Sequence, residues 1–419
     1  MKRKSGNLIA ALDIGSRNVR MAVGQIIETE MSGNELQILG AVDYQTEGMN
    51  KGKINSIEDV VSSISACLER AERMVGVPID SVWVGISGLQ IMLQNSKGVV
   101  AVSKANNEIT EEDVSRALDA TRSIATPLNY EVLHVLPRSY GVDGQAAIKD
   151  PVGMTGIRLE VDSSIILGAS AQIKNLTKAV YRSGLEIDDL VLSILACSEA
   201  VVTKRQKELG VAVVDIGATT TSIIVFEEGE MIHTGVLPLG SENVTNDLAI
   251  GLRTSVDIAE LTKIEYGHCI PESTDRRTTI DLQDVGASSS EVIKQRYTNE
   301  IINARVEEIL QKVDDELRKV QRSGLLPAGI VFTGGGSKIP GMVDCAKKIL
   351  RLPATLGYPL NIVSVTEKVN DLGFSTVLVL VKWGSLMDSV DTRRGRVNVF
   401  KSFGKAGGQL KKWFKVLVP

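Results

Sequence analysis

VAVVDIGATTTSIIVF (211–226) is an apolar run that ends in Asp-Ile-Gly, followed by a turn of small, hydroxyl-bearing residues and a second apolar run. LIAALDIGSRNVRMAV (8–23) has the same form. Both predict a β-hairpin in which an Asp ends the first strand and a Gly forms the turn. Because the pattern recurs about 200 residues along the chain, the sequence indicates two duplicated domains.

The two turns have the composition of a phosphate-binding loop. Backbone N–H groups and hydroxyls in a turn rich in Gly, Ser and Thr can converge on one anion. A carboxylate beside such a turn can hold Mg²⁺ or its waters, since this ion prefers hard oxygen ligands. Two loops of this kind that face each other would clamp one polyphosphate. Either hairpin alone is equally compatible with an ordinary turn.

A third stretch, AGIVFTGGGSKIPG (328–341), places three glycines where a predicted strand meets a predicted helix. Without side chains, the backbone there can approach a flat ring closely. A helix-entry turn by itself would explain the triplet, but its position after the two hairpins favours a nucleotide site. The sequence therefore predicts a cleft in which two loops hold phosphates and the glycine triplet lines the base.

The composition narrows the chemistry. Four cysteines and three histidines are scattered along 419 residues without a CxxC pair. This pattern disfavours a disulfide framework, a zinc site and histidine-base catalysis, and it fits a reducing cytoplasm. His134, in the apolar segment LHVLP, is expected to be a packed strand residue. The apolar run FSTVLVLVKWG (374–384) is too short to span a bilayer.

The chain ends in a basic segment on an otherwise acidic protein. The net charge is −4, yet residues 392–419 contain eight Lys and Arg residues and no acidic residue, which indicates an anionic partner. As a helix, residues 406–419 would carry an apolar stripe with lysines beside it, as membrane-surface helices do. Residues 388–405 would be a flexible linker. A core helix and a nucleic-acid-binding tail are the alternatives, the second disfavoured by the acidic body. The predicted membrane-binding residues are Leu410, Lys411, Lys412, Trp413, Phe414, Lys415 and Leu417.

The order of these motifs resembles that of the actin/Hsp70/sugar-kinase ATPase superfamily. LDIGSRNVR (12–20) and VVDIGATTTS (213–222) resemble its two phosphate loops, and VFTGGGSKIPG (331–341) its adenosine motif. Two further segments, VPIDSVWVGISG (77–88) and residues 237–267, are similar to the FtsA family of bacterial cell-division proteins. That resemblance covers nearly the whole chain.

The resemblance implies an α/β fold with two actin-like halves, an inserted α+β subdomain (1C) and a C-terminal amphipathic helix. A predicted helix at 108–124, N-capped by Thr110, fits the insert. Subdomain 1A would comprise residues 1–88, 168–200 and 371–387. Subdomain 1C would comprise 89–167, subdomain 2A residues 201–244 and 312–370, and subdomain 2B residues 245–311.

The resemblance also implies roles for single residues, with ATP and Mg²⁺ as cofactors. Asp13 and Asp215 would be the metal-side carboxylates, and Glu199, with Asp215, would be catalytic by positioning the attacking water. Glu199 is alternatively a solvated helix residue, and Glu260 with Lys263 an ordinary surface pair. The residues expected to contact the nucleotide are Asp13, Gly15, Ser16, Arg17, Asp215, Gly217, Ala218, Thr219, Thr220, Glu260, Lys263, Gly334, Gly335, Gly336 and Lys338.

One departure concerns turnover. FtsA-like second loops usually run Gly-Gly-Gly-Thr-Thr-Asp, whereas here Ala218 and Thr219 narrow the approach to phosphate and Ser222 replaces the acid. Binding tolerates this change more readily than hydrolysis does, so we expect ATP binding with weak or absent ATPase activity.

The implied function is that of an actin-like adaptor at the division septum. It would polymerise on the inner face of the cytoplasmic membrane as a peripheral protein and bind the C-terminal tail of FtsZ through subdomain 2B. It would recruit later division proteins through subdomain 1C, and it would bind no nucleic acid. The alternatives are a pilus assembly protein of the PilM kind and a soluble kinase or phosphatase of the same superfamily. An Hsp70-type chaperone would need a peptide-binding domain for which too few residues remain.

Overall fold

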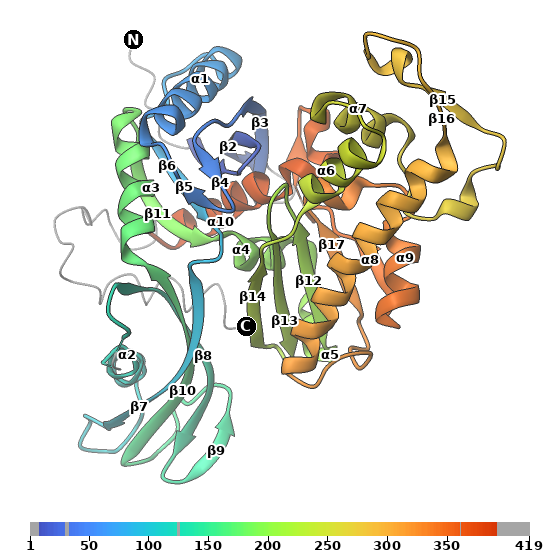
Figure 1. The fold of residues 1–419 in the computed structure, drawn as a ribbon. Coiled ribbons are helices and arrows are strands. Elements are labelled where there is room, and N and C mark those ends of the chain that lie inside the picture. Colours follow the sequence, from blue (N-terminus) through green and yellow to red (C-terminus); the bar gives the residue numbers. More distant parts are fainter. Residues whose placement is uncertain (1–7, 30–32, 124–125, 361, 392–419) are drawn as a thin grey trace.

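The structure is a computed structural model that describes residues 8–29, 33–123, 126–360 and 362–391. These residues form two α/β halves side by side and a smaller sheet domain that extends from the first half (Figure 1). The expected α/β class with two halves and an insert is thereby confirmed. The predicted membrane-binding residues, and the rest of 392–419, lie outside the described part of the chain.

The first half is built on a six-stranded sheet with the strand order β11-β6-β1-β2-β3-β19. β1 is antiparallel to β2 and parallel to β6. Helices α1 (Ile57–Val75) and α3 (Ser170–Arg182) cover one face, and a short hairpin of β4 (Met49–Asn50) and β5 (Lys53–Ile54) precedes α1. The strands of the sheet are β1 (Leu8–Ile14), β2 (Asn18–Thr29), β3 (Gly33–Gln45), β6 (Ser81–Ile86), β11 (Glu186–Leu192) and β19 (Val363–Ser364).

The second half repeats the centre of this arrangement. β12 (Val211–Ile216) is antiparallel to β13 (Thr221–Glu227) and parallel to β17 (Ile330–Thr333). The full order is β14-β13-β12-β17-β18, and α8 and α9 cover one face. Both predicted hairpins are therefore confirmed, and each lies at the centre of its own sheet. The remaining elements are β14 (Glu230–Leu237), β18 (Ala354–Leu356), α8 (Gln295–Lys319) and α9 (Met342–Leu350).

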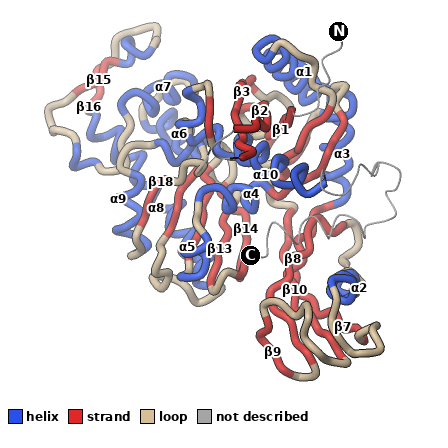
Figure 2. The backbone as a smooth tube through the Cα atoms, turned by 180° about the vertical axis from the view of Figure 1, so that it is seen from behind, coloured by secondary structure: helices blue, strands red, loops and turns tan. Residues whose placement is uncertain are grey.

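Two helices, α4 (Ser193–Val201) and α10 (Ser375–Asp391), lie between the sheets of the two halves (Figure 2). Their apolar side chains join Ala11 of β1 and Val213 of β12 in one buried cluster. Ala10 and Ala212, one position earlier, belong to the clusters on the opposite faces. This alternation buries both faces of each hairpin strand and explains why each strand is apolar up to its aspartate.

Apart from Phe374, which ends η5, the apolar run 374–384 is the largely buried beginning of α10. The helix continues to Asp391 and so extends into the segment predicted as a linker from residue 388. Within the described ranges, no helix combines the length and the apolar character needed to cross a bilayer.

The inserted domain is a four-stranded antiparallel sheet, β7-β10-β8-β9, that carries one helix, α2. A Cβ on Gly98 would lie 2.1 Å from the carbonyl oxygen of Ala117, so a glycine is needed where α2 rests on β7. His134 is a buried strand residue, as predicted, and its Nε2 accepts the Leu192 N–H at 2.9 Å. The elements are β7 (Ile91–Ala101), α2 (Glu111–Thr121), β8 (Tyr130–Val142), β9 (Gln145–Ile148) and β10 (Arg158–Ala169).

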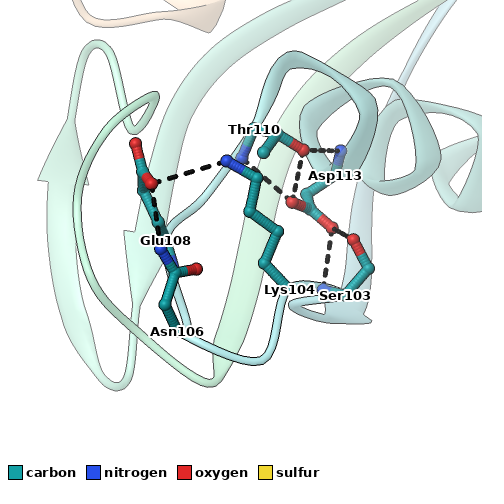
Figure 3. Close-up of polar contacts among 6 residues, drawn as sticks. All are labelled: Ser103, Lys104, Asn106, Glu108, Thr110 and Asp113. Carbon is teal, nitrogen blue, oxygen red and sulfur yellow. Dashed lines mark hydrogen bonds and ion pairs between the residues drawn. The ribbon is translucent and has the colours of Figure 1, made fainter.

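Thr110 caps α2, as the sequence predicts (Figure 3). Its hydroxyl accepts the Asp113 N–H at 3.4 Å, and the Asp113 carboxylate accepts the Thr110 N–H at 2.9 Å. Asp113 also accepts the N–H and the hydroxyl of Ser103, which fixes the loop before the helix. Although burial opposes it, these hydrogen bonds hold the pKa of Asp113 well below its usual range.

The second half carries α6 (Ser241–Gly251) and α7 (Val256–Tyr266) beside the hairpin β15 (Thr279–Asp281) and β16 (Val292–Lys294). This hairpin projects at the end of the molecule opposite the inserted domain (Figure 2). The short helix α5 (Lys204–Leu209) precedes β12, and the 3₁₀ turn η3 (Gly335–Lys338) follows β17. The other 3₁₀ turns are η1 (Pro271–Ser273), η2 (Leu282–Val285), η4 (Glu367–Asn370) and η5 (Leu372–Phe374).

Candidate nucleotide cleft

The turns of the two hairpins meet between the halves. Each turn closes with the same bond: Gly15 N–H donates to the Asn18 carbonyl at 3.0 Å, and Gly217 N–H donates to the Thr220 carbonyl at 2.9 Å. The Thr219 hydroxyl then donates to Ser16 Oγ at 2.7 Å. The predicted phosphate loops therefore have matching geometry and touch each other.

An acidic pair lies at the base of these loops. Burial raises the pKa of Asp13, with Arg20 opposing it. Burial and the charge of Asp13 raise the pKa of Asp215 to about 6, and Arg20 and Thr376 counter this only in part. Neither carboxylate forms an ion pair within the described chain, and Asp215 Oδ2 accepts the Thr376 hydroxyl at 3.4 Å. Two desolvated carboxylates whose charges are only partly compensated fit the position of a cation.

The donor set suits Mg²⁺ better than a transition metal. No group of three or more His, Cys, Asp and Glu side chains with metal-binding proximity occurs in the residues that the structure describes. Mg²⁺ commonly binds through one or two carboxylates and retains several waters, so a two-aspartate site is adequate for it. Asp13 and Asp215 are the residues that would hold the ion.

The glycine triplet is packed against this acidic pair. Gly334 has φ +83°, and a Cβ there would lie 2.0 Å from Asp215 Oδ1. A Cβ on Gly336 would lie 2.5 Å from the Ile216 side chain, whereas one on Gly335 would meet nothing within 4 Å. Only the first and third glycines are thus required by contacts with β12. Those contacts hold the predicted adenine-side turn beside the second phosphate loop.

Lys338 follows the triplet and pairs with Asp371 at 3.0 Å. This ion pair joins the second half to the segment that leads into α10. The Lys338 side chain is half-exposed, so the ammonium group is accessible from solvent as well.

Glu260 and Lys263 are not an exposed surface pair. Lys263 Nζ lies 2.6 Å from Glu260 Oε2 and 2.8 Å from Thr245 Oγ1, and its side chain is only 7% exposed. Arg17 of the first loop lies 3.5 Å from the same carboxylate. Although burial opposes it, the Lys263 charge lowers the pKa of Glu260. The group therefore ties α7 of the second half to the first loop.

Glu199 is directed elsewhere. Its carboxylate pairs with Lys207 of α5 at 2.5 Å, and it is not among the charges that act on Asp13 or Asp215. The α4 side chain that does face the acids is Cys197, whose thiol donates to Thr376 Oγ1 at 3.6 Å. The structure thus gives the predicted water-positioning role of Glu199 no geometric support.

Sequence reasoning missed three residues that shape the cleft. Thr376 is the hydroxyl donor to Asp215. A Cβ on Gly240 would lie 2.4 Å from the Ala218 carbonyl, which accepts the N–H of Glu242 at 2.8 Å. A Cβ on Gly85 would lie 3.3 Å from Asp13 Oδ1. Of these three residues, only Gly240 could have been identified from the sequence, because a glycine just before a predicted helix indicates a turn.

The remaining predicted residues are placed as follows. Ala218 and Thr220 lie in the second loop with Gly217 and Thr219, and Ser222 lies in β13 opposite Asp215 rather than in the loop. The contacts join Ser16 with Thr219, Arg17 with Glu260 and Lys263, and Asp215 with the position of Gly334. Lys338 pairs instead with Asp371, and Glu199 with Lys207.

Comparison with known proteins places this geometry in context. Residues 212–378 match the family model described as cell division protein FtsA, and residues 88–167 match the SHS2 domain inserted in FtsA. The cell division protein FtsA of Pseudomonas aeruginosa is 37% identical over 91% of this chain and 90% of its own. That of Bacillus subtilis is 39% identical over 85% of this chain and 79% of its own.

Solved structures show the fold at greater distance. A PilM–PilN type IV pilus biogenesis complex superposes with a TM-score of 0.63 at 17% identity, covering 90% of this chain and 98% of that one. MreB 5 of Spiroplasma citri bound to AMPPNP superposes with a TM-score of 0.54 at 12% identity, covering 93% and 100%. These likenesses establish an actin-like fold, and the identity to PilM is far below that to the FtsA proteins.

Proposed function

This chain belongs to the FtsA family of cell-division proteins, and we propose that it is an ATP-binding, actin-like adaptor that joins the bacterial division ring to the cytoplasmic membrane. The observation that carries the nucleotide part is the meeting of two equivalent Asp-Ile-Gly turns, one from each half, with Ser16 and Thr219 2.7 Å apart. A clamp made from both halves makes their relative position sensitive to what lies between them.

In this proposal, each part of the cleft has a separate task. The N–H groups and hydroxyls of Ser16, Thr219 and Thr220 bind phosphate oxygens, and Arg17 leaves Glu260 to join them. Asp13 and Asp215 hold Mg²⁺, which supplies positive charge to neighbouring phosphates when bound. Gly334, Gly335, Gly336 and Lys338 line the adenine, and Glu260 and Lys263 face the ribose.

We propose that turnover is slow or absent. The Ala218 methyl and the Thr219 side chain occupy the second loop, and Glu199 pairs with Lys207 rather than facing the aspartates. With Glu199 paired to Lys207 and both Asp13 and Asp215 assigned to Mg²⁺, the proposal leaves no carboxylate to orient an attacking water. Binding, rather than hydrolysis, would then control the relation of the two halves.

The proposed FtsZ contact is on the α7–α8 side of the second half. A surface hollow of about 510 Å³ lies at the start of α8. It combines guanidinium and ammonium groups with an aromatic ring and an apolar side chain, which suits a short peptide that offers both carboxylates and apolar residues. Its lining residues are Arg276, Ile293, Lys294, Arg296, Tyr297 and Glu300.

The other partners complete the proposal. Residues 406–419 would bind anionic lipid on the inner face of the membrane, with each lysine near the surface adding about 1 kcal/mol. One segment of this length would bind weakly, so polymerisation of the chain would multiply the affinity. The inserted domain would contact later division proteins. The protein would accordingly be peripheral to the membrane at the division septum.

A vesicle assay with purified FtsZ tests this function. The full chain with Mg²⁺ and ATP should carry FtsZ into the pellet with anionic vesicles, and a chain lacking residues 406–419 should leave both in the supernatant. Trp413→Glu with Phe414→Glu should act like the truncation. The matched control is Leu128→Glu with Leu325→Glu, two exposed apolar residues elsewhere, which should sediment normally. Equal sedimentation of full-length and truncated chains would refute the tether.

A further inference from the structure

The inserted domain contacts both halves of the molecule, although the chain connects it only to the first. β7 and β10 link it to the first half, while Lys149, directly after β9, reaches the second half. Lys149 Nζ lies 3.4 Å from the Glu208 carboxylate on α5 and donates to the Glu228 carbonyl at 3.1 Å. Arg138 of β8 lies 3.7 Å from Glu230 of β14. Figure 1 shows β8 and β14 on facing sides of the two domains.

The acceptor side is an acidic corner of the second half made from two elements. The Glu228 N–H donates to the Glu208 carbonyl at 3.2 Å, and the Gly229 N–H donates to the Lys207 carbonyl at 3.2 Å. These bonds fix the β13–β14 turn against α5, with Glu228 at a φ of 55°. Glu208, the Glu228 carbonyl and Glu230 consequently form one acidic corner that faces Lys149 and Arg138 of the inserted domain.

We propose that this contact is an electrostatic latch that makes the position of the inserted domain depend on the state of the cleft between the halves. The inserted domain moves with the first half, and its latch partners move with the second. Any change in the relative position of the halves must therefore stretch the latch or shift the inserted domain. By linkage, loss of the latch must change the affinity of whatever ligand sets the position of the halves.

The latch is weak enough to be reversible. Lys149 and Glu208 are 64% and 51% exposed, and Arg138 and Glu230 are 36% and 25% exposed. Exposed ion pairs are screened by salt and contribute little each. β14 also lies against β7 and β8 near the domain junction, so release of the latch frees the far end of the inserted domain while the near end stays packed.

Spin labels can test the contact without any ligand. The cysteines Cys67, Cys197, Cys269 and Cys345 are free and buried, so labels can be directed to Gln145→Cys on β9 and Arg205→Cys on α5. The full-length chain should give one narrow distance distribution, and Lys149→Glu should broaden it. Adding Glu208→Lys to Lys149→Glu should narrow it again. The matched control is Lys97→Glu, which breaks the Lys97–Glu160 pair inside the inserted sheet and should leave the distribution unchanged.

Two results would overturn the latch. One is a distance distribution for Lys149→Glu that is as narrow as that of the unchanged protein. The other is a distribution that stays broad when Glu208→Lys is added. Coupling to the cleft is measured with Mg²⁺ and ATP, and this arm rests on the proposed function. Lys149→Glu should change the ATP Kd by about two- to fivefold, the range available to an exposed pair, and Glu208→Lys should restore it. Equal affinities in all three proteins would overturn the coupling. If the unchanged protein bound no ATP, the proposed function and the coupling would both fall, while the distances would still decide the contact.

Discussion

The Thr219 hydroxyl donates to Ser16 Oγ at 2.7 Å, across 203 residues of sequence. Because these hydroxyls belong to loops from opposite halves, the space that a phosphate would take is closed by a direct protein contact. In the proposed binding mode, a nucleotide would replace this bond, and Arg17 would leave Glu260 to reach a phosphate. In this mode, binding and rearrangement of the two loops would therefore be one event.

The first prediction concerns Asp215→Asn. It removes one of the two buried carboxylates without a change of size, so we expect ATP affinity in Mg²⁺ to fall at least about tenfold. Affinity in EDTA should change much less. Titration calorimetry in both conditions measures the difference. Asp162→Asn on β10, outside the cleft, makes the same change of charge and should bind normally; equal affinities for both variants would exclude Asp215 from the metal site.

The second prediction concerns pH and the stability of the ligand-free protein. Burial and the charge of Asp13 raise the pKa of Asp215 to about 6, above its unfolded value, so the folded state binds the proton more tightly. The stability that comes from this proton is complete below about pH 4 and is lost as the pH rises through about 6. Asp215→Asn should therefore be more stable than the unchanged protein at about pH 7.5, on the order of 2 kcal/mol.

Urea unfolding in EDTA measures this difference, which should shrink as the pH is lowered to about 5. A gap that is independent of pH would mean that Asp215 is not the titrating group. Added Mg²⁺ should have the opposite pH dependence, because the metal binds the ionised carboxylates and loses affinity below about pH 6.

The third prediction concerns Thr376. Its hydroxyl donates to Asp215 Oδ2 at 3.4 Å and favours the ionised carboxylate. Thr376→Val keeps the shape and removes the donor, so the midpoint of Mg²⁺-dependent ATP binding should move to higher pH by roughly half a unit. Thr376→Ser should keep the midpoint of the unchanged protein. An unchanged midpoint in the valine variant, or a shift of equal size in the serine variant, would show that this hydroxyl does not act on Asp215.

The fourth prediction concerns the buried pair of Glu260 and Lys263. Glu260→Gln leaves the Lys263 ammonium, which is 7% exposed, without its carboxylate. We expect a loss of about 3 kcal/mol in the free energy of unfolding, because an uncompensated buried charge remains. Chemical denaturation measures it. Glu265→Gln, an exposed residue on the same helix, is the control and should cost less than about 0.5 kcal/mol; a similar small cost for Glu260→Gln would contradict the burial of the pair.

Short stretches of sequence were sufficient to predict much of the fold. The Asp-Ile-Gly hairpins, the Thr110 cap and the strand position of His134 each follow from a few consecutive residues, and all three are confirmed. Strand alternation, turn glycines and capping hydroxyls act between neighbours, so they can be identified without knowledge of distant packing. The resemblance of whole segments then supplied the arrangement of the halves.

The sequence was insufficient to predict where the Glu199 side chain points. The family resemblance implied a role at the phosphates, but Lys207, eight residues further along on α5, pairs with the Glu199 carboxylate. A helix residue is oriented by the packing of all faces of its helix, and α4 buries Cys197 toward the acids instead. No count of sequence spacing distinguishes these two faces when nearly all of α4 is buried.

By itself, the sequence determined the two turns and the glycine triplet, because their backbone geometry depends on glycine and on hydroxyl groups within a few residues. Tertiary structure alone decided which groups meet: Thr376 with Asp215, Arg17 with Glu260, and Lys149 with Glu208. Each of these pairs joins segments that are far apart in the sequence. Their contact depends on how the two sheets pack around α4 and α10, a property of the whole core that no short stretch of sequence contains.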